Sequence, residues 1–239
     1  MGEIKQRIES VLGQIHQAEA RYDRKKGSVM LLAVSKTWPK EYILKAAEAG
    51  QNCFGENYIQ ESIDKIDAIQ SMESPPDIEW HFIGAIQSNK TKDIANRFQW
   101  IHSVDRLKIA RRLSEQRDSS LPPLNICLQI NISGEQSKSG IGPAEALSIA
   151  REINELPNIR LRGLMAIPAP SDDIKDQRAI FHRVKELQEL LIHHGLPLDT
   201  LSMGMSGDME AAIAEGTTMV RVGTAIFGKR NYPKANSFD

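Results

Sequence analysis

The sequence has few cysteines, and it lacks the motifs that mark most nucleotide-binding and nucleophilic sites. Two cysteines, Cys53 and Cys127, occur in 239 residues, both within apolar runs of strand length. We interpret them as small buried hydrophobic residues, because a disulfide framework or a cysteine metal site needs more of them at defined spacings. No set of histidines, cysteines and carboxylates has metal-ligand spacing. There is no Walker loop, G-x-S-x-G or strand-anchored G-x-G-x-x-G, so the common phosphate-loop, esterase and dinucleotide-binding classes have no support.

The sequence also lacks an excess of charge of one sign and any long hydrophobic run. It has 30 Lys and Arg residues against 31 Asp and Glu, a formal net charge of -1. Without a basic stripe or cluster, we expect neither a nucleic-acid partner nor a membrane-surface partner. No apolar stretch approaches membrane-spanning length, and the segment 1–26 is too charged for a secretory signal. We therefore expect a cytoplasmic protein.

What the sequence does contain is a regular alternation of strand and helix patterns. An amphipathic helix is predicted first, from the spacing of Ile4, Ile8, Leu12 and Ile15. The predicted strands are Leu31–Ser35, Asn52–Gly55, Trp80–Gly84, Trp100–Val104, Asn125–Asn131, Arg160–Ile167, Thr200–Met203 and Met219–Gly223. The predicted helices between them are Lys40–Ala49, Tyr58–Gln70, Asn89–Phe98, Arg106–Arg117, Ala144–Glu155, Ile174–His194 and Met209–Ala214. This alternation is typical of a single (β/α)₈ barrel, here one domain over residues 1–239; an open doubly wound sheet is the alternative.

Lys36 is the most informative single residue. It follows the apolar run 31–34, at the carboxyl end of a predicted strand and just before a helix that opens near Pro39. Barrel enzymes place their chemistry at this end of the strands. Partial desolvation there lowers the pKa of an amine and makes it nucleophilic, as a Schiff-base lysine requires. A solvated strand terminus is the ordinary alternative.

Two segments near the carboxyl end of the sequence indicate a phosphate site. Ser206 and Gly207 precede a predicted helix, so a hydroxyl and backbone N–H groups can face an anion at its amino terminus. Gly223 and Thr224 follow the eighth predicted strand, and barrels commonly bind phosphate after strands seven and eight. The alternative is that the glycines serve tight turns and Ser206 only caps a helix.

A nucleophilic lysine opposite a phosphate site fits two chemistries. One is a phosphosugar aldolase, and the other is a pyridoxal 5′-phosphate (PLP) site. Spacing does not choose between them, although Arg221 on the eighth strand suits PLP, whose ring nitrogen pairs with Asp or Arg. His81 lies inside a strand and is typical of a satisfied core histidine. Lys138, in the polar loop after the fifth strand, is interpreted as a surface lysine, with a second amine facing the site as the alternative.

The motifs then resemble those of the YggS/PROSC family of PLP homeostasis proteins. The resemblance runs in order from Leu31 to Gly228. It is carried by Leu32-Ala33-Val34-Ser35-Lys36-Thr37, Phe54-Gly55-Glu56-Asn57-Tyr58, Trp80-His81-Phe82-Ile83-Gly84, Gln87-Ser88-Asn89-Lys90, Gln129-Ile130-Asn131-Ile132, Gly163-Leu164-Met165-Ala166-Ile167, Met203-Gly204-Met205-Ser206, Asp208-Met209, Val220-Arg221-Val222-Gly223-Thr224 and Ile226-Phe227-Gly228.

This resemblance implies a monomeric barrel similar to the amino-terminal domain of alanine racemase. It implies that Lys36 holds PLP as an internal aldimine, with the phosphate held by Ser206, Gly207, Gly223 and Thr224. Arg221 would face the pyridine nitrogen, keep it unprotonated and so weaken the ring as an electron sink.

Asn57, His81 and Met165 complete the cofactor site that the resemblance implies, with Asn57 and His81 expected to support the direct contacts. Alanine racemases add a carboxy-terminal domain that supplies a tyrosine acid/base, and the chain to Asp239 leaves no room for one. We therefore expect a PLP carrier or regulator that supplies PLP-dependent apoenzymes, without robust catalysis. An amino-acid racemase is the alternative, and a phosphosugar aldolase comes third.

Overall fold

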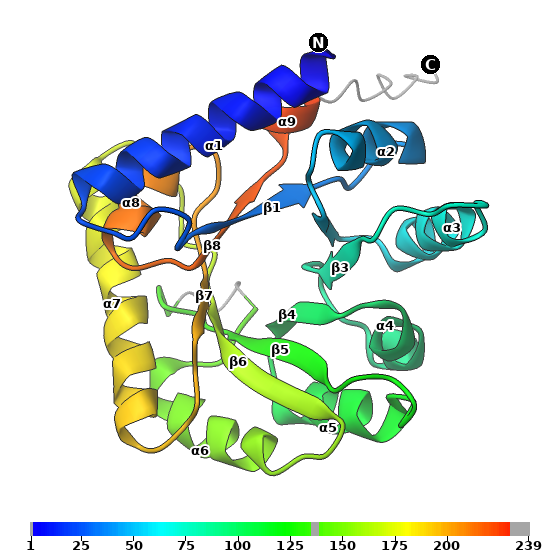
Figure 1. The fold of residues 1–239 in the computed structure, drawn as a ribbon. Coiled ribbons are helices and arrows are strands. Elements are labelled where there is room, and N and C mark those ends of the chain that lie inside the picture. Colours follow the sequence, from blue (N-terminus) through cyan, green and yellow to red (C-terminus); the bar gives the residue numbers. More distant parts are fainter. Residues whose placement is uncertain (1, 135–138, 230–239) are drawn as a thin grey trace, which may run out of the picture.

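The structure is a computed structural model that describes residues 2–134 and 139–229. Eight parallel strands form a closed barrel in chain order, and β8 pairs with β1. Figure 1 shows the strands at the centre with helices around them. The strands are β1 (Met30–Val34), β2 (Cys53–Glu56), β3 (Glu79–Phe82), β4 (Trp100–Val104), β5 (Leu124–Gln129), β6 (Ile159–Met165), β7 (Thr200–Ser202) and β8 (Met219–Val222). The structure thus confirms the predicted barrel and not the alternative of an open doubly wound sheet. Lys138, interpreted above as a surface lysine with a second amine as the alternative, lies outside the described residues.

The helices follow the strands as the sequence pattern predicts. They are α1 (Glu3–Arg21), α2 (Lys40–Glu48), α3 (Ile59–Gln70), α4 (Thr91–Arg97), α5 (Leu107–Gln116), α6 (Pro143–Asn154), α7 (Ile174–His193), α8 (Met209–Ala214) and α9 (Thr224–Phe227), with a short 3₁₀ helix η1 at Ser88–Lys90. Helix α9, one turn long, is not in the sequence prediction. None of the described helices is both long and apolar enough to cross a membrane.

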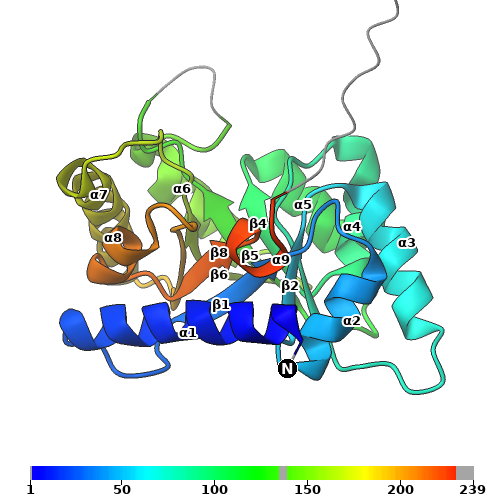
Figure 2. The same ribbon diagram turned by 90° about the horizontal axis from the view of Figure 1, so that it is seen from above.

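The predicted amino-terminal helix is confirmed as α1, which covers the side of the barrel near its closure. Figure 2 shows α1 lying along α8 and α2, and it also contacts α9. Its buried face includes Ile4, Ile8, Val11 and Ile15, at the spacing of one helical stripe. Helix α1 therefore adds apolar cover beside the barrel closure, against α8, α9 and α2.

Alternation along the strands decides which residues enter the barrel interior. Outward residues such as Ala33 and Phe54 pack in the large core between strands and helices. Inward residues form separate small clusters, for example Leu32 with Cys53 and Met219. Because side chains alternate along a strand, an inward residue two positions later lies one layer nearer the carboxyl end. The alternation of inward and outward side chains therefore determines which residues reach the candidate site.

Candidate functional site

Lys36 lies in a tight turn whose two flanking residues are fixed by side chains from β2 and α3. The Ser35 hydroxyl donates to Glu56 Oε1 at 2.7 Å, and the Thr37 N–H donates to Glu61 Oε1 at 2.6 Å. Lys65 Nζ donates to the Ser35 carbonyl at 3.0 Å. The backbone on both sides of Lys36 is therefore held in place, which directs its side chain toward the mouth of the barrel.

Lys65 links these supports through a buried ion-pair group. Its side chain is 8% exposed, and its ammonium contacts Glu56 Oε1 at 2.8 Å and Glu61 Oε1 at 2.5 Å. Glu56 is fully buried, and burial raises its pKa although Lys65 opposes that change. Its second oxygen has no partner among the described residues. Sequence reasoning missed this group, which follows from placing β2 and α3 beside the end of β1.

A cleft of about 300 Å³ opens at the carboxyl ends of β1 and β8. Its lining includes seven of the nine residues predicted for the site: Lys36, Asn57, Ser206, Gly207, Arg221, Gly223 and Thr224. Val34, Ile83, Ile167 and Met205 supply apolar walls. Two larger depressions, of about 480 and 540 Å³, do not include Lys36. The sequence-predicted residues thus meet at one apolar-walled cleft, which is the usual character of a small-molecule site.

The cleft lined by Lys36 also contains two helix starts. Gly223 precedes α9, and the turn containing Ser206 and Gly207 precedes α8. Asp208 Oδ1 closes that turn by accepting from the Met205 N–H at 2.5 Å. The first N–H groups of a helix have no partner within the helix, so they can receive an anion. A Cβ on Gly223 would lie 3.0 Å from the Val34 carbonyl oxygen, which explains the glycine where β8 approaches β1.

Arg221 forms the floor of the cleft as a buried cation. Its side chain donates to the Ser202 carbonyl at 2.6 Å, the Ser202 hydroxyl at 2.8 Å and the Ala166 carbonyl at 3.0 Å. Burial lowers its pKa to about 10, so the guanidinium stays charged at neutral pH. These bonds use three of its five N–H groups, which leaves donors for a ligand in the cleft.

Asn57 contributes an acceptor to the same cleft. Its side-chain oxygen is buried and has no hydrogen-bond partner among the described residues. A buried acceptor without a donor is costly, so its presence here suits a bound molecule with a donor. The loop carrying Asn57 packs on Gly84, where a Cβ would lie 2.0 Å from the Asn57 carbonyl oxygen. Glycine at position 84 is therefore required for this cleft wall.

Two predicted site residues, His81 and Met165, do not line the cleft. His81 is fully buried in β3, stacked on Trp100 at 5.6 Å between ring centroids. Met165 is buried in β6 and packs with Trp100 and Cys127. The physical reason is that side chains along a strand alternate between the two faces of the sheet. Ile83 and Ile167, two residues after His81 and Met165, occupy the next inward positions and reach the cleft instead.

The interior contains further polar side chains that sequence reasoning missed. His102 in β4 and Ser202 in β7 are both fully buried, and they connect His81 with Arg221 through hydrogen bonds. A polar residue inside an otherwise buried strand is the signal that could have revealed them, because such groups need a buried partner.

The sequence has close relatives among curated proteins. Residues 14–231 match the family model for the alanine racemase N-terminal domain. A Pseudomonas aeruginosa protein named pyridoxal phosphate homeostasis protein is 54% identical over 232 residues, covering 97% of this chain and 98% of the relative. One of the same name from Vibrio cholerae is 52% identical over 234 residues, covering 98% of this chain and 99% of the relative.

Solved structures show the same fold. PipY of Synechococcus elongatus with PLP bound has a TM-score of 0.82 and 34% identity, covering 95% of this chain and 100% of PipY. Alanine racemase from Corynebacterium glutamicum has a TM-score of 0.69 and 18% identity, covering 92% of this chain and 62% of the racemase. The second likeness concerns the fold alone.

Proposed function

The chain belongs to the alanine racemase N-terminal domain family, and within it to the pyridoxal phosphate homeostasis proteins; from this premise we propose that it binds PLP through Lys36 and carries it without robust catalysis. Lys36 would hold the cofactor covalently, through a Schiff base between its amine and the cofactor aldehyde. Ser206, Gly207, Gly223 and Thr224 hold the phosphate. We propose a cytoplasmic protein that acts as a monomer.

The observation that carries this proposal is that Lys36 and two helix starts line the same cleft. A molecule with an aldehyde at one end and a phosphate at the other satisfies both sides, and the apolar walls suit its ring. Asn57 offers an acceptor to a donor on that molecule. PipY, which shares this fold, is described with PLP bound. The residues present therefore fit the cofactor.

Arg221 is the residue that we assign to the ring nitrogen. PLP supplies an electron sink for amino-acid chemistry when that nitrogen is protonated. A guanidinium cannot give up its proton at neutral pH, so Arg221 holds the nitrogen as an acceptor only. This weakens the sink and favours retention of the cofactor over turnover. The relatives' names point the same way, because they describe homeostasis.

The test is the visible spectrum of the purified protein, compared with Lys36→Ala and Lys90→Ala variants. Lys90 is the matched control, because it lines a neighbouring depression and not the cleft. We expect an absorbance band from bound PLP in the wild-type and Lys90→Ala proteins and none in Lys36→Ala. Borohydride reduction should leave a pyridoxyl group on Lys36, found by peptide mapping. A wild-type protein that stays colourless with added PLP would contradict the proposal.

A second arm of that experiment separates a carrier from the racemase alternative. The loaded protein is incubated with a PLP-dependent apoenzyme, and with amino acids in deuterated water. A carrier restores activity to the apoenzyme while leaving the Cα proton of the amino acids in place. Sustained Cα exchange that needs Lys36 would favour the racemase instead.

A further inference from the structure

We propose that Glu79, His81, His102, Ser202 and Arg221 form one hydrogen-bonded chain through the barrel, the interior chain, which positions Arg221 at the cleft floor. Its links measure 2.9 Å from Glu79 Oε1 to His81 Nε2, 2.9 Å from His81 Nδ1 to His102 Nε2, 2.7 Å from His102 Nδ1 to Ser202 Oγ and 2.8 Å from Ser202 Oγ to Arg221. The chain begins at the amino-terminal end of β3 and ends at the cleft.

With both rings neutral, the two ends of the interior chain give each hydrogen bond in it one direction. Arg221 can only donate, and an ionised Glu79 can only accept. His81 donates from Nε2 to Glu79, so its Nδ1 accepts from His102 Nε2. His102 Nδ1 then accepts from the Ser202 hydroxyl, whose oxygen accepts from Arg221. Both histidines thus carry their proton on Nε2.

The surroundings of the two histidines agree with neutral rings. Both are fully buried, and burial lowers their pKa values. His81 is faced by Glu79, by the Trp100 ring and by His102. His102 is faced by His81 and Arg221, and both oppose its protonation. Glu79 receives bonds from His81, Cys53 and Trp100, and the bond from His81 contributes most to lowering its pKa.

The interior chain gives Arg221 a partner of opposite charge that its direct contacts do not provide. Among the described residues, its guanidinium donates to two backbone carbonyls and a hydroxyl, all neutral, and the Asp208 carboxylate acts on it through its charge. Aligned hydrogen bonds polarise one another in a low-dielectric interior, so the negative charge at Glu79 strengthens the bond at Ser202. His81 and His102 are thus positioning residues for the guanidinium that, in the proposed function, faces the cofactor.

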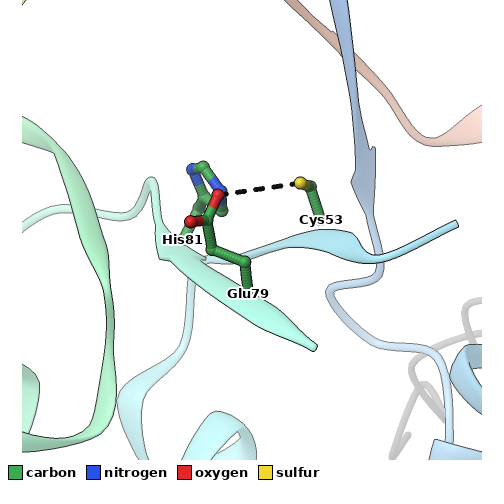
Figure 3. A group of neighbouring side chains, drawn as sticks. All are labelled: Cys53, Glu79 and His81. Atoms are coloured by element: carbon green, nitrogen blue, oxygen red, sulfur yellow. Dashed lines mark hydrogen bonds and ion pairs between the residues drawn. The ribbon is translucent and has the colours of Figure 1, made fainter. Parts of the chain in front are cut away.

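A metal site is the competing interpretation of the residues at the Glu79 end of the interior chain. Figure 3 shows Cys53, Glu79 and His81, whose ligand atoms lie within 4.8 Å of one another. A metal here needs the Cys53 thiolate and the lone pair of His81 Nε2. Burial raises the pKa of the Cys53 thiol to about 12, and the thiol faces Glu79 as a donor at 3.7 Å. These contacts favour the interior chain, in which His81 Nε2 carries a proton.

The first measurement is ¹⁵N NMR of the histidine side chains in the unmutated protein at neutral pH, with and without PLP. We expect the rings of both His81 and His102 to be neutral and protonated on Nε2. A proton on His102 Nδ1, or a doubly protonated ring, would overturn the proposed interior chain. So would a stoichiometric response of His81 Nε2 to added Zn²⁺, which would assign the metal site instead. This readout needs no variant to fold and no cofactor to bind.

The second measurement tests positioning through Glu79→Gln, which keeps an acceptor for His81 and removes the charge. Glu152→Gln is the matched control, because Glu152 pairs with Arg111 in an exposed ion pair. We expect Glu79→Gln to shift the absorbance band of bound PLP and to weaken PLP retention roughly threefold to tenfold, while Glu152→Gln changes neither. An unchanged band and retention in Glu79→Gln would overturn the positioning role. Failure of the wild-type protein to bind PLP would refute the proposed function. The NMR measurement would still test the interior chain, because it does not depend on PLP.

Discussion

Lys65 shows how a residue outside the cleft determines what Lys36 can do. It is the cation that both Glu56 and Glu61 share, and it holds the carbonyl of the residue before Lys36. The sequence allowed Lys36 to be predicted, because a lysine after an apolar strand is visible in one segment. It did not allow Lys65 to be predicted, because a lysine on a helix is normally solvated. Only the packing of α3 against the end of β1 buries it.

We predict that Lys65→Met destabilises the protein by about 3–5 kcal/mol, because it leaves the buried Glu56 carboxylate without its cation. Urea unfolding at neutral pH measures this change. Adding Glu56→Gln to Lys65→Met should recover part of the loss, since the amide carries no charge to bury. Lys92→Met, an exposed position on α4, is the control and should leave the unfolding free energy nearly unchanged. Equal costs for Lys65→Met and Lys92→Met would show that the ion-pair group does not support this turn.

At the scale of elements, the order of strands and helices could be predicted, and their ends could not. The pattern predicted one helix over 89–98, whereas the structure has η1 and then α4 from Thr91. The Ser88 carbonyl accepts from the Thr91 hydroxyl at 2.9 Å and from Arg112 Nε at 2.9 Å. This second contact comes from α5, so tertiary packing sets the boundary and local propensity does not.

The loops that form the cleft wall make a prediction at the same scale. Gly84→Ala places a Cβ against the backbone of Asn57, and the β2–α3 loop must move to relieve the clash. We expect PLP retention to fall about tenfold or more, because the movement withdraws a buried hydrogen-bonding group from the binding site, with the far-ultraviolet circular dichroism unchanged. Gly13→Ala is the control, because a Cβ there meets nothing within 4 Å and adds helix propensity to α1. Wild-type retention in Gly84→Ala would mean that Asn57 does not shape the site.

For the whole molecule, the sequence predicted which end of the barrel carries the site and not how deep each inward residue lies. Depth depends on register around the closed sheet, for example Gly55 opposite His81 and Leu32 opposite Arg221. Those pairings are set by all eight strands together, and no single segment encodes them. His81 was expected to support the direct cofactor contacts without a predicted depth, and the structure places it a layer below the cleft. Its burial with His102 gives the molecule a measurable response to pH.

We predict that the free energy of unfolding falls as the pH is lowered from about 7.5 to 5. Burial lowers the pKa values of His81 and His102 in the folded state, while the unfolded residues take up protons near pH 6.5. The unfolded state then binds more protons, so stability is present above that pH and is lost below it. For two such groups the slope of the unfolding free energy against pH approaches about 2.7 kcal/mol per pH unit, and His102→Asn should reduce it by about half.

The control variant is His193→Gln, on the exposed end of α7, which should leave this slope unchanged. Comparing slopes between variants in urea unfolding removes the carboxylate contributions common to both. A slope in His102→Asn equal to that of the wild type would mean that His102 is charged in the folded barrel. The hydrogen bond between His102 Nδ1 and Ser202 would then have to run from the histidine to the hydroxyl.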